Sequence, residues 1–538
     1  MKSISRENLA DGSGRSQRLE SPAAARWLAW LVPDLALTFA LVTLGAMFVM
    51  FHGATSLFRD TDAGWHILDG ERIILTRSLP HADPFSFSKP GQPWVAWEWG
   101  ADILMGAVYR LSGLAGVALT YGLLIAASVW MWFRLNGALK GSFLLSGLFF
   151  VPMLTTTMLH WLARPHVISW LFLLGTVWFC ERMPRNLRWQ HLTLVAIGAA
   201  AWANLHASFF FGPVIALVYA TGAWLRPLIW NDQGLVDGKG HGFQGQGSGE
   251  VMGRRYLLLA MASLAATLVN PNGWRLHQHV FSYLFDSGLL NQIVEFQSFD
   301  FHQEGASQII VALILCFAGA FAALAVHKPE RFLLSLLLAA IALRSERALP
   351  VAALVLLPLA NGSITAILRR VNGLTPWLRG KVDNALSYGD RLYAVERHFH
   401  GLAIIPVVAV LILGSIRNSA GFPASKCPVA ASAVIASLPA GARILASDDF
   451  GGYLIFRFKG ERKVFLDGRS DFYGGEFLKR YSRMAEARPG WRGLFNQWDF
   501  TNALLPPDSA LIPALEAYGW HELYRDETAV LLAGRSKL

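Results

Sequence analysis

The feature that most constrains this chain is a series of long apolar runs, which recur between residues 33 and 416. A helix of about 20 apolar residues crosses the hydrocarbon core of a bilayer with all its backbone hydrogen bonds made internally. The composition agrees, because 54% of the 538 residues are hydrophobic and only 16% are charged, whereas soluble domains carry about 25% charged residues. The sequence therefore predicts a membrane protein with many spans.

We predict about eleven transmembrane helices, several of them short or interrupted by glycine and proline. They cover residues 33–53, 114–133, 142–160, 166–181, 191–210, 212–226, 256–271, 307–326, 332–346, 349–368 and 401–416. The stretch 97–112 places Glu98, Asp102 and Arg110 among apolar residues, and this pattern indicates an interfacial helix.

Lysine and arginine are distributed unevenly between alternate loops. One set of loops, together with the N-terminal tail, carries 22 of them, against 9 in the other set up to residue 416. Because basic loops remain in the cytoplasm, we expect a cytoplasmic N-terminus. An odd number of spans then places the C-terminal residues outside, and the net charge of +10 requires no nucleic-acid partner.

The chain divides into three predicted parts: a disordered cytoplasmic tail (1–26), a transmembrane domain (27–416) and an outer domain (417–538). Within the second part, residues 54–98 form a long outer loop. The third part alternates short strands, such as ARILASDD and RKVFLDG, with helices such as GGEFLKRYSRMAEA, which predicts a small α/β domain. The Gly-rich residues 231–250 are predicted to be a flexible linker. Cys180, Cys316 and Cys427 are expected to be unpaired.

The long outer loop opens with a pair of carboxylates, Asp60 and Asp62. Two carboxylates at this spacing can hold one divalent cation, Mg²⁺ or Mn²⁺, with His66 as a further ligand, or one can orient the other as a base. If the segment is helical, Asp62, His66 and Asp69 approximate one face. The alternative is structural, with Asp62 as the N-cap of a helix.

Other polar residues gather at the predicted outer ends of the spans. Arginines there can hold a phosphate through forked hydrogen bonds; alternatively, each extends to the headgroups or pairs with a neighbouring carboxylate. Tryptophans of the outer loop belong to an interfacial belt or stack on sugar faces. The candidate substrate-binding residues are Arg164, His166, His206, Arg344, Arg347, Trp97 and Glu98.

The outer domain holds acidic residues at predicted strand ends, where α/β folds place ligand sites. Asp448, Asp449, Asp467, Arg469 and Asp471 are the residues concerned. Tight turns are the alternative, which we favour for Asp467 and its following glycine.

The motifs D-T-D-A-G-W-H (60–66), R-P-H (164–166), N-L-H-A (204–207), N-P-N-G (270–273) and V-F-L-D-G-R-S-D-F-Y (464–473) resemble those of a bacterial family of multi-span membrane proteins. The acidic pair after the first span, the interfacial helix and the soluble outer domain resemble, more broadly, the GT-C glycosyltransferases. These enzymes take a sugar from a polyprenyl-phosphate carrier, and a carboxylate of the first outer loop serves as base or metal ligand.

The resemblance implies an inner-membrane glycosyltransferase with a mainly α, GT-C-like fold and a periplasmic C-terminal domain. It transfers a polyprenyl-phosphate-linked sugar to a lipid or glycan outside the cell. The central role falls on Asp62, supported by Asp60. The alternative is a non-catalytic scaffold of a polysaccharide assembly or export machine, and a transporter is disfavoured because no matching repeat halves are present.

Overall fold

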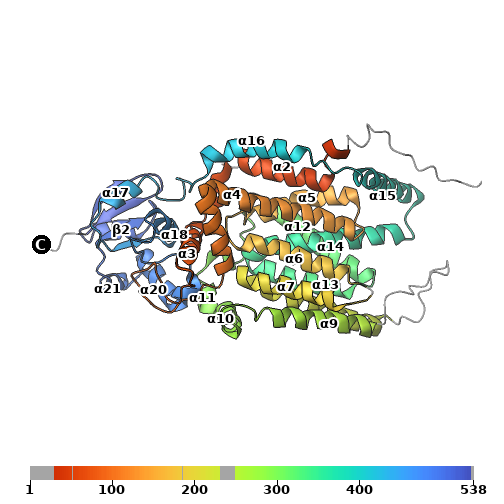
Figure 1. Cartoon of the computed structure of the whole chain (residues 1–538), viewed down its shortest axis with the longest axis horizontal. Helices are drawn as coiled ribbons and strands as arrows, with labels where there is room; N and C mark the ends of the chain where they lie inside the picture. The colour runs from red at the N-terminus through yellow and green to blue at the C-terminus, as the bar shows by residue number, and fades with distance from the viewer. Residues whose placement is uncertain (1–28, 51–52, 185, 231–248, 535–538) are drawn as a thin grey trace, which may run out of the picture.

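The computed structural model describes residues 29–50, 53–184, 186–230 and 249–534, so the predicted tail at 1–26 and most of the linker at 231–250 lie outside the described residues. Every predicted span coincides with a helix of one elongated bundle (Figure 1). The bundle helices are α2 (Leu35–Val49), α4 (Trp99–Ala138), α5 (Phe143–Met158), α6 (His166–Glu181), α7 (Trp189–Leu205), α8 (Phe211–Ile229), α9 (Gly249–Ala266), α12 (Ala306–Ala325), α13 (Pro329–Arg344), α14 (Leu349–Arg370) and α16 (Ile404–Ser419).

Among the described residues, five helical segments are long and apolar enough to cross a membrane. They are Ala29–Val49, Trp99–Ala138, Ala207–Ile229, Ala306–Ala325 and Glu346–Arg370. The last is the central one, because 72% of its most apolar window is buried inside the protein, against 50% or less in the others. Cys180, Cys316 and Cys427 are free and buried, as predicted.

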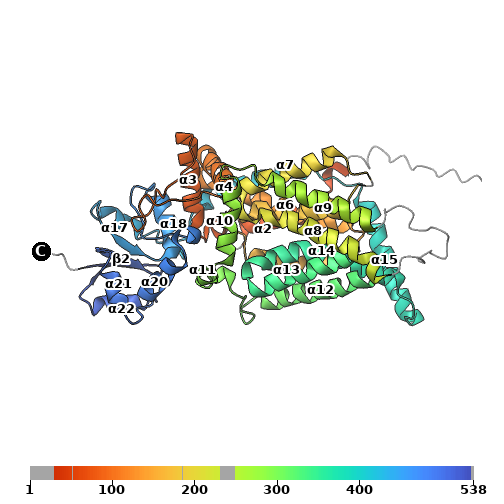
Figure 2. The ribbon, with the colours of Figure 1, turned by 90° about the horizontal axis from the view of Figure 1, so that it is seen from below.

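Helix α4 consists of two arms that meet at Gly113. The backbone there has φ 62° and ψ −159°, outside the helical region, a conformation that glycine adopts at little cost. The first arm covers the predicted helix 97–112 and lies across the end of the bundle beside α3 (Asp62–Thr76) (Figures 1 and 2). Its location at a membrane interface stays a prediction.

The contact between α3 and the first arm of α4 depends on two glycines. A Cβ atom on Gly70 would clash with the carbonyl oxygen of Asp102, and a Cβ atom on Gly106 would clash with the backbone of Glu71. The two helix backbones therefore approach more closely than any larger side chain allows. This fixes the start of α3, where the acidic pair lies, against the end of the bundle.

The C-terminal residues form a small α/β domain beyond this end (Figures 1 and 2). Its sheet has the order β1-β2-β4-β3, built from β1 (Ile444–Ala446), β2 (Asn502–Leu505), β3 (His521–Arg525) and β4 (Val530–Ala533). β1 and β2 are parallel, with Ile444 opposite Asn502, and the other neighbours are antiparallel. The predicted helix after residue 473 is α20 (Gly475–Ala485).

The strand predicted over R-K-V-F-L-D-G (462–468) is wrong. Val464 forms an isolated parallel bridge with Ser86 of the long outer loop instead of joining the sheet. The N–H of Val464 donates to Phe85 at 3.0 Å, and the N–H of Phe87 donates back to Val464 at 2.9 Å. The apolar segment is extended because the outer loop pairs with it, and this joins the loop to the C-terminal domain.

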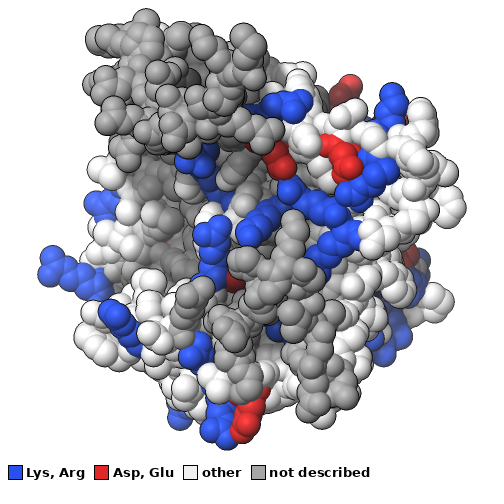
Figure 3. Space-filling view, turned by 90° about the vertical axis from the view of Figure 1, so that its right-hand side faces the viewer, with Lys and Arg blue, Asp and Glu red and all other residues white. Residues whose placement is uncertain are grey.

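The opposite end of the bundle is basic. Figure 3 looks onto this end, and lysine and arginine side chains are spread across it. Helix α15 (Pro376–Glu396) lies there (Figure 1) and carries exposed Lys381 and Arg391 and half-buried Arg379. This basic end matches the uneven distribution of lysine and arginine between alternate loops in the sequence. The orientation in the membrane, with this end in the cytoplasm, stays a prediction.

Candidate functional site

The acidic pair lies at the start of α3, on the end of the bundle that faces the C-terminal domain. Thr61, not Asp62, occupies the N-cap position and makes no side-chain capping bond. The Asp60 carboxylate instead accepts the backbone N–H of Asp62 at 2.9 Å. The alternative in which Asp62 caps the helix is therefore wrong, and its buried side chain is directed elsewhere.

Arg164 joins both carboxylates. Its Nη1 lies 2.5 Å from Asp60 Oδ2, and its Nη2 lies 2.9 Å from Asp62 Oδ2. The Arg164 side chain is only 14% exposed, so these ion pairs are poorly screened by solvent. Residues separated by about one hundred positions thus form one cluster, which we call the acidic–arginine cluster (Asp60, Asp62 and Arg164).

A second arginine fixes the loop that carries Arg164. Arg59 donates to the carbonyl oxygens of Met158, Leu159 and Trp161 at 3.1, 2.7 and 3.2 Å. These groups belong to the end of α5 and the loop after it, where carbonyls lack helical partners. Arg59 is therefore a positioning residue, and it was missed in the sequence although it precedes the acidic pair directly.

The environment of Asp62 alters its protonation. Burial and the neighbouring Asp60 carboxylate raise the pKa of Asp62 to about 7, against the opposing effect of Arg164. A carboxyl group with a pKa near the working pH is suited to accept a proton, because its basic form is both populated and strong enough.

Two further groups extend the cluster toward the bundle. Glu295, in the short helix η3 (Val294–Phe296), lies 3.6 Å from Arg164 and 3.3 Å from Arg347. Arg347 belongs to η4 (Glu346–Ala348). Burial raises the pKa of Glu295, but Arg347 and Arg164 outweigh it and lower the pKa to about 2.

Arg344 is not part of this arrangement. It is exposed in the last turn of α13 and makes no ion pair within the described part of the chain. The prediction that it acts together with Arg164 and Arg347 is therefore not supported. The backbone turns into η4 after Ser345, so two arginines three positions apart point to different surroundings.

Glu98 lies between two of the predicted histidines. Its carboxylate is 3.4 Å from His206 Nε2 and 3.8 Å from His66 Nε2. Burial raises the pKa of Glu98 to about 7, although Arg164 and Arg347 lower it. Glu98 therefore belongs to the same electrostatic environment as the acidic–arginine cluster.

The remaining predicted side chains lie around this centre. His166 Nε2 donates to the His160 carbonyl at 3.0 Å, and its ring centroid is 6.5 Å from that of His206. Trp97 packs edge-on against His279, with ring centroids 5.0 Å apart. Trp97 is thus part of the contact between the outer loop and α10 (Trp274–Phe285).

The predicted metal ligands are not grouped around a common point. His66 Nδ1 lies 2.5 Å from Asp102 Oδ1, while Asp60 and Asp62 both contact the Arg164 guanidinium. Across the described residues, no three His, Cys, Asp or Glu side chains are arranged to hold a metal ion. The predicted Mg²⁺ or Mn²⁺ site of Asp60, Asp62 and His66 does not fit this geometry, because the arginine stands where the cation would bind.

The C-terminal domain closes over the cluster. A Cβ atom on Gly468 would clash with the Asp62 carboxylate, so the backbone of this turn forms one wall of the Asp62 environment. Asp471, in the same turn, lies 3.0 Å from His279 of α10. The C-terminal domain therefore contributes backbone that packs directly against the Asp62 carboxylate.

The turn is held by a buried ion pair and not by backbone turn chemistry alone. Arg469 is 2% exposed and contacts Asp467 at 2.7 Å and Asp83 of the outer loop at 2.8 Å. Its guanidinium also lies 4.7 Å from the ring centre of Trp94. These contacts give Asp467 and Arg469 a structural role in joining the loop to the domain.

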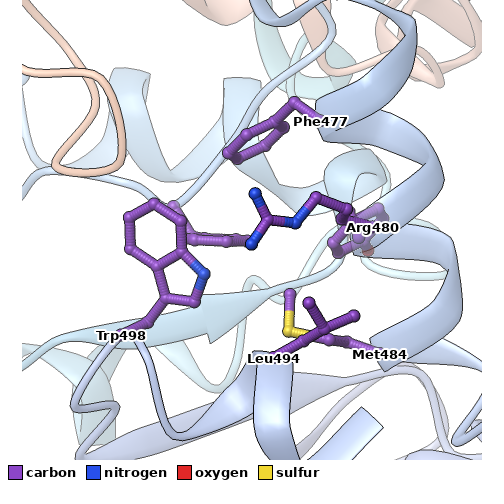
Figure 4. Close-up of a pocket in the computed structure, with 7 residues that line it drawn as sticks. Phe477, Arg480, Met484, Leu494 and Trp498 are labelled. Atoms are coloured by element: carbon purple, nitrogen blue, oxygen red, sulfur yellow. The ribbon is translucent and has the colours of Figure 1, made fainter. Parts of the chain in front are cut away.

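Figure 4 shows a hollow in the C-terminal domain, and no residue of the acidic–arginine cluster lines it. It holds about 230 Å³ of empty space, part of which is open solvent, and its lining includes Phe477, Arg480 and Trp498. None of the residues that line it is a predicted site residue. The chemistry-bearing groups identified in the sequence lie at the junction of domain and bundle.

Several solved structures are similar to this chain, among them the following three. The oligosaccharyltransferase of Archaeoglobus fulgidus, tethered with an acceptor peptide containing the NVT sequon, has a TM-score of 0.51 at 12% identity, covering 87% of this chain and 68% of that chain. Its apo form gives 0.48 at 10% identity, covering 87% and 69%. ArnT from Cupriavidus metallidurans, bound to undecaprenyl phosphate, gives 0.43 at 13% identity, covering 94% and 98%.

No protein-family model matches the sequence, and no curated protein is similar to it at a significant level. The likeness to the tethered oligosaccharyltransferase establishes the fold alone, at this low identity. The chain therefore has a GT-C-like fold, a helical membrane domain followed by a small α/β domain, as predicted.

Proposed function

We propose that this protein is a membrane glycosyltransferase that moves a sugar from a polyprenyl-phosphate carrier to a lipid or glycan acceptor on the outer side of a bacterial inner membrane. The observation that carries the proposal is the acidic–arginine cluster. It places a buried carboxylate and a partly buried guanidinium side by side at the domain end of a GT-C-like bundle. A transfer of this kind needs a base for the acceptor and a cation for the leaving phosphate.

In the proposed reaction, Asp62 takes the proton from the acceptor hydroxyl as its oxygen bonds to the sugar. The bond between the sugar and the phosphate breaks, and its electron pair remains on the phosphate oxygen. Arg164 and Arg347 stabilise that charge, and Asp60 supports Asp62 through its backbone contact at 2.9 Å. Charge stabilisation of this kind is strongest where the groups are fixed and shielded from water.

The groups around Glu98 are proposed to bind the sugar and acceptor. Glu98 and His206 offer an acceptor and a donor for sugar hydroxyls, and Trp97 supplies an aromatic face. Arg164 and Arg347 act electrostatically on both Glu98 and His206. Trp97 directly precedes Glu98 in the chain.

The pH profile tests the role of Asp62. Its basic form is active, so kcat/KM should rise through the pKa of Asp62, near 7. Asp60 raises that pKa, and the D60N variant should therefore move the rise to lower pH. A pH–rate profile of both proteins checks this. An unchanged profile in D60N, or a shift to higher pH, contradicts the assignment of Asp62 as the base.

Purified protein offered a panel of polyprenyl-phosphate sugars tests the proposal as a whole. The expected result is release of the polyprenyl phosphate together with a glycosylated acceptor, detected by mass spectrometry. If no member of the panel is consumed with membrane lipids and glycans present as acceptors, the proposal fails.

A non-catalytic scaffold is the second candidate. It is favoured by the fact that Arg164 is already paired with Asp60, Asp62 and Glu295, as expected of a purely structural ion pair. A scaffold predicts no turnover and a loss of stability when any member of the acidic–arginine cluster is replaced.

A further inference from the structure

Glu295 stands between the two arginines of the site. Its Oε1 lies 3.6 Å from Arg164 Nη1 and its Oε2 lies 3.3 Å from Arg347 Nη2. The arginines come from separate elements, the loop before α6 and η4, and among the described residues Glu295 is the carboxylate that forms an ion pair with both of them. One carboxylate therefore occupies the position where two guanidinium groups converge.

Two guanidinium groups that converge on one point form an anion site. Carboxylates and phosphates accept the same forked hydrogen bonds from arginine, and a phosphate offers more oxygens and more charge. The side chains of Glu295 and Arg347 are 30% and 28% exposed, whereas that of Arg164 is 14% exposed. The anion site thus opens toward the surface at the Glu295 side.

We propose that the Glu295 carboxylate is an internal placeholder for the substrate's phosphate, which displaces it from Arg164 and Arg347. This inference rests on the proposed function, because that function assigns the phosphate to these two arginines. It adds that Glu295 occupies the phosphate position in the free protein. It also adds that a ligand must carry more negative charge than a carboxylate to displace Glu295.

The segment that carries Glu295 lies mostly at the surface, so the Glu295 side chain can move. Val294 is 78% exposed, and the neighbouring residues 291–298 contain no fully buried side chain. Two contacts hold the backbone near η4: Ser345 Oγ donates to the Glu295 carbonyl at 3.0 Å, and the Glu346 N–H donates to Gln297 at 2.8 Å. Displacement therefore requires rotation of one side chain, without exposure of a core.

A carboxylate at this position also stabilises the two arginines when no phosphate is bound. Without Glu295, Arg347 has no carboxylate partner within the described part of the chain, and Arg164 loses one of three. Partly buried cations without partners are costly. A neutral lipid cannot replace the carboxylate on both arginines, so the site selects for an anionic headgroup.

Calorimetric titration of the detergent-solubilised protein with inorganic pyrophosphate tests the inference. Glu295→Gln should bind pyrophosphate at least about tenfold more tightly than the unaltered protein, because no internal anion competes. Glu304→Gln, which removes an exposed carboxylate from the same outer segment, should bind like the unaltered protein. Equal or weaker binding by Glu295→Gln overturns the proposal.

Glu295→Asp covers the case in which Glu295→Gln does not fold. The shorter side chain keeps the charge but withdraws it from Arg347, so binding should tighten by less than in Glu295→Gln. If the aspartate variant binds no more tightly than the unaltered protein, the proposal is also overturned.

The outcome is separable from that of the proposed function. If Glu295→Gln binds pyrophosphate more tightly but the protein transfers no sugar, the placeholder role of Glu295 is supported and the transferase function is contradicted. If the protein transfers sugar but Glu295→Gln has an unchanged affinity for pyrophosphate, the transferase function is supported and the placeholder role of Glu295 is contradicted.

Discussion

Sugar transfer by the Asp62→Asn variant is expected to fall by about 10²–10⁴-fold, the usual contribution of a general base. Asparagine keeps the size of the side chain and one oxygen for Arg164, but it cannot take a proton. The pKa of Asp62, raised to about 7 by burial and by Asp60, is what makes this carboxyl effective near neutrality. Single-turnover assays with a polyprenyl-phosphate sugar measure the loss.

Asp69→Asn is the matched control. Asp69 lies on the same helix, is fully buried, and has its pKa raised to about 7 chiefly by burial. Within the described part of the chain, neither of its carboxylate oxygens has a hydrogen-bond partner, so it stands outside the acidic–arginine cluster. Transfer by Asp69→Asn should stay within about threefold of the unaltered protein. Full activity in Asp62→Asn, or equal losses in both variants, would remove Asp62 from the reaction.

The Arg469→Met variant is expected to lose about 3–5 kcal/mol of stability, the usual cost of breaking a buried ion pair. Methionine fills much of the space but leaves the carboxylates of Asp467 and Asp83 buried without a cation. The outer loop should then separate from the C-terminal domain, since Arg469 joins the two. Thermal unfolding and limited proteolysis of the loop measure the effect.

Arg443→Met is the control for this variant. Arg443 also lies over an aromatic ring of the outer loop, with its guanidinium 5.1 Å from the ring centre of Phe87, but it has no ion pair in the described structure. We expect a change below about 1 kcal/mol. A loss in Arg469→Met no larger than in Arg443→Met would show that the buried ion pair does not join loop and domain.

The helical part of the fold could be predicted because its signal is local. Each span is an apolar run, and the physical requirement for such a run is the same wherever it occurs. The segment around Val464 shows where this reasoning stops. Its apolar, β-branched character predicts an extended backbone correctly, but the partner, Ser86, lies nearly four hundred residues away. Local pattern does not reveal which edge a strand will join.

The site was predictable in its parts and not in its connections. The acidic pair and Arg164 stood out because ionisable residues are expensive near a membrane. Their contact depends on how α3 and the loop before α6 fold together, which no periodicity records. Arg344 and Arg347 look equivalent in the sequence, yet of the two only Arg347 forms an ion pair in the described structure, with Glu295, which also contacts Arg164. The difference is set by the turn of the backbone at Ser345.

Glu295 was missed for a related reason. It ends an amphipathic stretch whose apolar residues dominate the pattern, and a single glutamate there resembles an ordinary surface residue. Its role depends on contacts with two arginines that are distant in sequence: Arg164, 131 positions before it, and Arg347, 52 positions after it. A search for buried or half-buried acidic residues in outer segments would have included it.

A structure determined with a polyprenyl phosphate bound would show whether Arg164 and Asp62 form the phosphate and acceptor site. We expect the phosphate within hydrogen-bond distance of the Arg164 guanidinium, with the Asp62 carboxylate facing the same space. A phosphate bound elsewhere, with Arg164 still paired to Asp60 and Asp62 as in the free protein, would contradict this expectation.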